Sequence, residues 1–187
     1  MKNYVLSFSS NKVIAVTAIV ITFFFFGNSS MLAQQATTTI NLVLADVLSI
    51  EPGSVADGGT VDFLYENVND YNSEKTATIN NSLIITFSKP FDLKVKANGA
   101  TFENGSHHIP VDVLTIRKNE SSQLTGSSAP VVLSTQDQVL ISGADQGSKL
   151  NLDLDYIIPQ ARSTSSDILG KPAGIYSQKV TYTLTAI

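Results

Sequence analysis

Apolar and polar residues alternate at every second position through most of this chain. The clearest example is LNLDLDYII, residues 150–158, whose apolar residues share one face while Asn151, Asp153 and Asp155 share the other. A period of two places successive side chains on opposite faces of a β-strand, whereas an α-helix needs a period near 3.6. The pattern therefore predicts strands, and we expect the three polar side chains on a solvated outer face.

Similar runs follow one another, separated by clusters of Gly, Asn, Ser and Asp. They cover residues 37–50, 61–65, 77–88, 91–97, 109–117, 131–135, 138–142 and 174–187. Asn-Gly pairs at 98–99 and 104–105 predict hairpin turns. No run has a helical apolar period, so we expect at most one short helical turn. About eight to ten short strands with this spacing predict an all-β fold, an Ig-like two-sheet antiparallel β-sandwich.

The first 33 residues have the pattern of a secretory signal peptide. Lys2 and Lys12 precede an uncharged apolar run over residues 13–26, and Ala33 is a small residue suited to cleavage before Gln34. The run is short for a membrane span, which needs about 20 residues. We expect a secreted protein that meets the membrane only through the cleaved signal; a retained N-terminal anchor is the alternative.

Charge and cysteine content narrow the classes of partner. Without Lys2 and Lys12, 10 of the 12 basic residues remain against 16 acidic ones, a net charge of −6. Nucleic acid is an unsuitable partner for such a chain, because binding phosphates requires a basic surface. The chain has no Cys, so its stability must come from a core and from strand pairing without disulfides.

Residues suited to catalysis or cofactor binding are sparse. His107 and His108 are adjacent and have no evident third metal ligand, and neither a GxSxG motif nor a glycine-rich phosphate loop occurs. We therefore predict a protein that is not an enzyme and uses no cofactor or metal. Tyr65, Tyr71 and Phe102 lie in or near loops and could stack on a glycan, although packing in the core or in a loop is the simpler explanation of these residues.

The end of the chain carries a specific pattern. Gly174 is the fourteenth residue from the end, and Tyr176 precedes a strand in which Val180, Tyr182 and Leu184 alternate with threonines. We expect these three apolar side chains to face the core. The strand resembles the closing strand of chaperone–usher pilus subunits and of spore coat protein U-like fimbrial domains. The ATTTINLVL and SLIITFSKPFDLKV segments are similar to other strands of these families.

The resemblance implies assembly by strand complementation. Pilus subunits are sandwiches that lack one strand, and the resulting groove is filled first by a periplasmic chaperone and then by the N-terminal extension of the next subunit. Ile40, Leu42 and Leu44 have the alternation that such a donor segment needs. The resemblance thus implies a pilin-like adhesive subunit that passes through the periplasm to the cell surface.

Two organisations remain open for the secreted part. In one, residues 34–45 are a donor segment and residues 46–187 a single β-sandwich domain. In the other, residues 37–50 form one long first strand that pairs in cis and switches between sheets. The second organisation corresponds to a self-contained sandwich that binds a glycan or another envelope protein.

Overall fold

The computed structural model describes residues 38–187, of which Leu44–Ile187 form one compact unit. The predicted signal peptide, residues 1–33, lies outside the described residues. Residues 38–43 are exposed and have no regular secondary structure. Within residues 38–187, no helix combines the length and apolar character that crossing a membrane would require.

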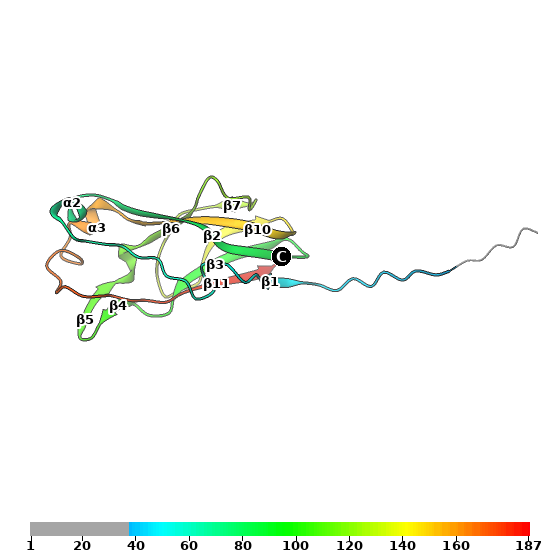
Figure 1. Cartoon of the computed structure of the whole chain (residues 1–187), viewed down its shortest axis with the longest axis horizontal. Helices are drawn as coiled ribbons and strands as arrows, with labels where there is room; N and C mark the ends of the chain where they lie inside the picture. The colour runs from blue at the N-terminus through cyan, green and yellow to red at the C-terminus, as the bar shows by residue number, and fades with distance from the viewer. Residues whose placement is uncertain (1–37) are drawn as a thin grey trace, which may run out of the picture. The chain divides into compact units, whose positions relative to one another are not determined.

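Two antiparallel sheets and a separate hairpin make up the domain (Figure 1). The five-stranded sheet has the order β1 (Leu48–Ile50), β2 (Lys75–Phe87), β10 (Gly147–Ile158), β6 (Thr115–Lys118) and β8 (Val131–Val132). The four-stranded sheet has the order β11 (Val180–Ala186), β3 (Phe91–Ala97), β9 (Gln138–Ala144) and β7 (Ser127–Ser128). The hairpin consists of β4 (Thr101–Asn104) and β5 (His107–Pro110). This architecture confirms the predicted all-β sandwich.

The core lies between the two sheets and follows from the alternation in the sequence. In β3, Phe91, Leu93 and Val95 are fully buried, and the polar residues between them point outward. Leu152 and Leu154 of β10 are equally buried on the facing sheet. Each such side chain contributes about 1.5–3 kcal/mol when it leaves water. The core therefore holds the two sheets together without a disulfide.

One side of the sandwich is closed by a segment that crosses between the sheets. Residues 127–134 begin as β7 beside β9 and continue as β8 beside β6. The backbone N–H of Leu133 donates to Leu114 O at 2.8 Å, and the N–H of Ala97 donates to Ser134 O at 2.8 Å. The segment thus bonds to strands of both sheets and seals this side of the core.

Short helices occur where the sequence predicted at most one helical turn. They are α2 (Val68–Tyr71), the 3-10 helix η1 (Val111–Val113) and α3 (Gln160–Ser163). The prediction was wrong because a single turn is too short to show a period of 3.6. Local signals explain α2 better, since Asn67 and Asp70 form a capping box at its N-terminus.

Several predicted strands also differ from the structure. The run over residues 37–50 is a strand only at β1, Leu48–Ile50. The run over residues 77–88 was expected to form two strand pieces around Asn80-Asn81, but it lies in one strand, β2 (Lys75–Phe87), with an irregularity around Asn81, which has a φ of 53°. Residues 109–117 are divided between β5, η1 and β6, because the chain turns at Pro110. Residues 61–65 belong to no sheet, because no other segment of residues 38–187 forms a backbone hydrogen bond with them.

Asp155 is buried, contrary to the expectation of a solvated face. Only 3% of the residue is exposed, and its carboxylate accepts hydrogen bonds from Thr78 Oγ1 at 2.7 Å, Asn119 Nδ2 at 2.7 Å and Arg117 Nε at 3.0 Å. Burial opposes ionisation, but these hydrogen bonds outweigh it and hold the pKa of Asp155 below its usual range. The loop after β6 covers this face of the sheet.

The lowered pKa makes Asp155 a source of acid sensitivity. The ionised Asp155 carboxylate contributes fully to the free energy of unfolding above its unfolded-state pKa, near 3.9. This contribution is lost as the pH falls through the lower folded-state pKa. At pH 7 we expect the free energy of unfolding of Asp155→Asn to be about 2 kcal/mol lower than that of the native protein. Between pH 7 and pH 2, this free energy should fall less in the variant than in the native protein. Urea denaturation at a series of pH values measures both effects. Asp137→Asn, at an exposed ion pair with Lys96, is the control and should follow the native profile; a native-like profile for Asp155→Asn would contradict the assignment.

Candidate functional site

The last strand, β11, uses only one of its two backbone edges. It pairs with β3 along its length, from Val180 opposite Ala97 to Ala186 opposite Phe91. Within residues 38–187, no strand pairs with the other edge. An unpaired edge of seven residues is a template for another strand.

Hydrogen bonds at both ends of β11 show which residues face the open edge. Lys179 O accepts from Asn98 N at 2.9 Å, and Ile187 N donates to Pro90 O at 3.0 Å. Because bonded and non-bonded pairs alternate in an antiparallel pair, the odd-numbered residues bond to β3. The N–H and C=O groups of the even-numbered residues therefore point away from the sheet: Val180, Tyr182, Leu184 and Ala186.

Three of these even-numbered residues also contribute side chains to the core. Val180, Tyr182 and Leu184 pack against the buried cluster, yet they remain only partly buried, unlike their fully buried neighbours in β3. The residues that offer free backbone groups thus also have incompletely covered apolar side chains. An added strand would satisfy both deficits at once.

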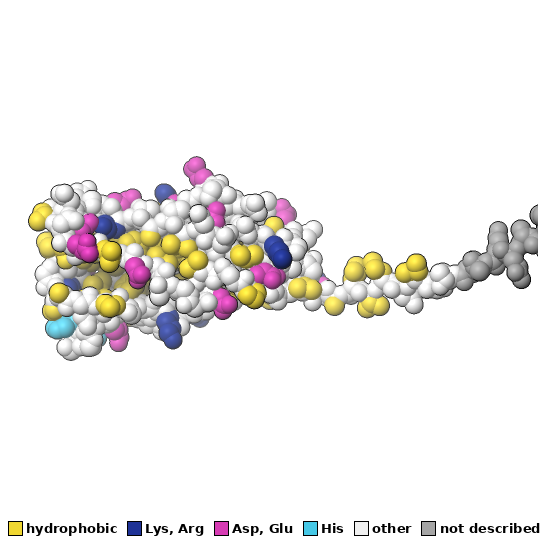
Figure 2. Space-filling model, in the orientation of Figure 1, with side chains coloured by type: hydrophobic (Ala, Val, Ile, Leu, Met, Phe, Trp, Pro, Cys, Tyr) yellow, Lys and Arg dark blue, Asp and Glu magenta, His cyan; other side chains and the backbone are white. Residues whose placement is uncertain are grey.

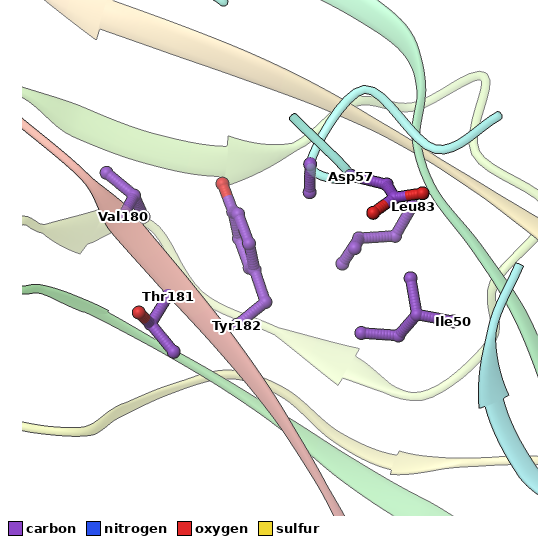
Figure 3. A pocket seen from close by; sticks show the side chains of 7 residues that line it. Ile50, Asp57, Leu83, Val180, Thr181 and Tyr182 are labelled. Atoms are coloured by element: carbon purple, nitrogen blue, oxygen red, sulfur yellow. The ribbon is translucent and has the colours of Figure 1, made fainter. Parts of the chain in front are cut away.

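A cavity opens between β11 and the edge of the facing sheet. It has a volume of about 310 Å³ and is lined by Ile50, Ala56, Asp57, Leu83, Val180, Thr181 and Tyr182. Figure 3 shows Val180, Thr181 and Tyr182 on β11 at one side of this space, and Ile50, Leu83 and Asp57 together at the other. We call the space between β11 and this side the groove.

The wall opposite β11 begins with the turn after β1. Glu51 N donates to Ile84 O at 2.7 Å, Val55 N to Asn81 O at 3.1 Å and Ala56 N to Ser82 O at 3.1 Å. These bonds fix the turn to β2. The wall that carries Ala56 and Asp57 is therefore anchored to the sheet.

Residues 60–65, which we call the strap, continue from this wall toward α2. Val61, Phe63 and Tyr65 are half-buried against the core, whereas Asp62 and Leu64 are exposed. No backbone–backbone hydrogen bond is formed by the strap within residues 38–187. In Figure 1 the strap leads from the turn after β1 toward α2. It has the side-chain pattern of a strand without the pairing of one.

The far end of the strap is fastened by a polar cluster. Tyr65 Oη and Ser163 Oγ are 2.8 Å apart, and Lys75 Nζ lies 2.6 Å from Asp70 Oδ1 and 5.6 Å from the Tyr65 ring centroid. The hydrogen bond from Lys75, followed by those from the backbone N–H groups of Glu66 and Asn67, lowers the pKa of Asp70 to about 2. The strap is therefore held at its two ends while its middle remains unpaired.

A tyrosine pair joins the two sheets beneath the groove. The hydroxyl oxygens of Tyr156, on β10, and Tyr182, on β11, lie 2.7 Å apart. Burial raises the pKa of both hydroxyls, that of Tyr182 well above its usual value, so both stay protonated at neutral pH. Although the Tyr182 side chain borders the groove, its hydroxyl lies deep between the sheets. This hydrogen bond ties the open edge to the facing sheet.

Other residues singled out from the sequence lie elsewhere. Ile40, Leu42 and Leu44 are 86%, 83% and 84% exposed and form no strand, so their donor role stays a prediction. Gly174, with a φ of 155°, and the half-buried Tyr176 precede β11 rather than belonging to it. The sequence thus located the closing strand but extended it too far toward the N-terminus.

The predicted glycan and histidine residues are placed but not gathered into a site. Tyr65 and Tyr71 have ring centroids 5.0 Å apart at 46°, while Phe102 packs against the core from β4. His107 and His108 are exposed on β5. Among residues 38–187, no group of three His, Cys, Asp or Glu side chains is arranged to hold a metal ion. The groove is the strongest candidate site, and sequence reasoning missed its second wall because residues 51–66 read as a turn and a strand.

Comparisons with known proteins leave the function to be inferred from this geometry. No family model and no curated protein matches the chain. Among solved structures, a chain from a structure of a chaperone–usher pilus, described in relation to the uncoiling of its rod, aligns with a TM-score of 0.42 and 13% identity, covering 86% of this chain and 100% of the other. Neither fold nor function follows from a similarity at this level.

The tyrosine pair gives a direct test of how the open edge is held. We expect Tyr156→Phe and Tyr182→Phe each to lose about 1 kcal/mol of unfolding free energy, and the double variant to lose little more than either one. Removing one hydroxyl leaves the other buried without its partner, so the two losses should not add. Guanidinium denaturation measures the three variants. Tyr176→Phe, whose hydroxyl bonds to Pro172 O at an exposed site, serves as the control; additive losses would show that the two hydroxyls act independently.

Proposed function

We propose that this protein is a non-enzymatic structural subunit that assembles by β-strand complementation. The observation that carries the proposal is the open edge of β11, whose even-numbered residues have free backbone groups and partly uncovered apolar side chains. An extended segment with apolar residues at every second position would pair with this edge and cover the groove. The function is thus the binding of a strand.

The N-terminal segment of a neighbouring copy is the occupant that we propose. Ile40, Leu42 and Leu44 have the required spacing, and their high exposure leaves them available. Burying each such side chain contributes about 1.5–3 kcal/mol, offset by the cost of ordering the segment. Three buried aliphatic side chains and a row of backbone hydrogen bonds together favour stable binding of this segment in the groove of the neighbouring copy.

Filling the groove in cis is disfavoured by the path of the chain. Ser88 N donates to Val47 O at 3.0 Å, which fixes the chain at the start of β1. Only residues 45 and 46 lie between Leu44 and this anchor, and each residue spans at most about 3.5 Å. So short a connection restricts the positions that the chain's own segment can reach, whereas a neighbour's segment is free of this constraint.

The proposed role agrees with the expected route of the protein. A secretory signal would deliver the chain through the periplasm to the cell surface, where polymers of such subunits serve in adhesion. A periplasmic chaperone that covers the groove before assembly belongs to the same proposal. These features rest on the sequence pattern of residues 1–33 and on the resemblance of the closing strand.

The donor segment is tested by placing a charge in it. We expect Leu42→Asp to abolish assembly of the secreted chain, because a carboxylate cannot enter an apolar groove. Size-exclusion chromatography with light scattering measures the mass, and Asn41→Gln is the control, which should assemble normally. A peptide of residues 38–45 should raise the melting temperature of the Leu42→Asp protein by filling its groove. Assembly of Leu42→Asp at native levels would refute the donor role.

The open edge is tested with proline at two adjacent positions. Ala186→Pro removes an N–H that points away from β3, so the domain should stay folded while peptide binding falls about fivefold or more, for the loss of about 1 kcal/mol. Thr185→Pro removes an N–H bonded to β3 and should destabilise the domain itself. Unfolding curves and peptide titrations separate these effects. Equal peptide affinity in Ala186→Pro and native protein would argue against pairing at this edge.

A further inference from the structure

The groove wall opposite β11 is unusually rich in acidic residues. Residues 13–74 contain no Lys or Arg, whereas residues 46–74 contain seven Asp and Glu. Four of these acids lie within residues 51–66: Glu51 and Asp57 on the wall, Asp62 on the strap, and Glu66 directly after the strap. Within residues 38–187, none of the four forms an ion pair or a side-chain hydrogen bond. Their charges are therefore not used in holding the domain together.

These acids follow the path that an added strand would take. Asp57 lines the cavity, Glu51 follows the cavity residue Ile50, and the exposed Asp62 lies on the strap between the half-buried Val61 and Phe63. Figure 2 shows a band of hydrophobic side chains across this face of the domain, with acidic side chains along its borders. The groove thus combines an apolar floor with an acidic rim.

The β11 side of the groove has no matching acids. Its outward-facing side chains are Thr181, Thr183 and Thr185, and one basic residue, Lys179, precedes the strand. A strand bound in the groove would turn every second side chain inward. The remaining side chains would face solvent between the threonines and the acidic rim. Positive charges at those outward positions would face unpaired carboxylates.

The chain's own N-terminal segment does not supply such charges. Between Ile40, Leu42 and Leu44, the outward positions are Asn41 and Val43, and the first charged residue after them is Asp46. The proposed donor therefore matches the floor of the groove but not its rim. A strand with Lys or Arg at the two outward positions would match both.

We propose that the groove also binds, and prefers, an extended strand from a different protein, with aliphatic side chains facing inward and Lys or Arg facing outward. This inference rests on the proposed strand-binding function of the groove and identifies the charge pattern of a partner strand that does not come from another copy of this chain. The acidic rim selects by charge, whereas the apolar floor accepts either strand. Such a strand would bind to the groove most tightly at low ionic strength, because salt screens the attraction between exposed charges.

Three peptides test the preference on the full secreted chain carrying Leu42→Asp, which cannot fill a neighbour's groove. The first is residues 38–45, the second carries Asn41→Lys and Val43→Lys, and the third carries Asn41→Glu and Val43→Glu. Fluorescence anisotropy at about 0.05 M and about 1 M NaCl gives their dissociation constants. We expect the basic peptide to bind roughly three- to tenfold more tightly than the neutral one at low salt, from two exposed pairs, and the acidic peptide to bind more weakly. At high salt, the ratio of the affinities of the basic and neutral peptides should approach one.

Charge variants assign the preference to the rim. In a protein that also carries Asp57→Asn and Asp62→Asn, the low-salt affinity ratio of basic to neutral peptide should fall by at least half. A control with Glu120→Gln and Asp137→Asn, away from residues 51–66, should keep the native ratio. If the neutral peptide binds and the basic one binds no more tightly at low salt, the proposed preference for a basic strand is refuted, while the strand-binding function of the groove still stands. If none of the three peptides binds, the strand-binding function itself fails.

Discussion

The antiparallel pairing of β11 with a single neighbour governs the properties of the groove. A strand has two edges, and the alternation of bonded pairs in β11 assigns the odd-numbered residues to β3 and leaves the even-numbered ones free. Because side chains alternate with the same period, the residues with free backbone groups are also those that face the core. One register therefore couples unsatisfied hydrogen bonding to exposed apolar surface, and a single added strand would remedy both.

The rest of the domain keeps this open edge from collapsing. Tyr182 is bonded to Tyr156 on the facing sheet, and the turn containing Val55 is bonded to β2. The strap is fastened at Tyr65 by Ser163 and stays unpaired in between. Both sides of the groove are thus fixed in the absence of an added strand. The free-energy cost of reorganising the domain when a strand binds would therefore be small.

Sequence periodicity predicted much of the sandwich and little of the groove. The alternation in residues 91–97 and 150–158 correctly located two strands, and the Asn104-Gly105 pair located the β4–β5 hairpin, because these signals are local. The burial of Asp155 could not be foreseen, since it depends on a loop that begins more than 30 residues earlier. The strap was predicted as an ordinary strand because its alternation is genuine; the absence of a pairing partner is a property of the tertiary structure. For the same reason, the sequence predicted the closing strand but not the cavity beside it.

The segment over residues 127–134 seals the other side of the sandwich by bonding to both sheets. In the assembly proposed above, each copy would consequently bind two neighbours: one through its donor strand and one through its groove. Such head-to-tail units join into unbranched filaments whose two ends differ. Growth would then occur only at the termini, and one occupied groove at the receiving end would arrest a whole filament. The number of free ends, rather than the concentration of subunits alone, would set the lengths of the polymers.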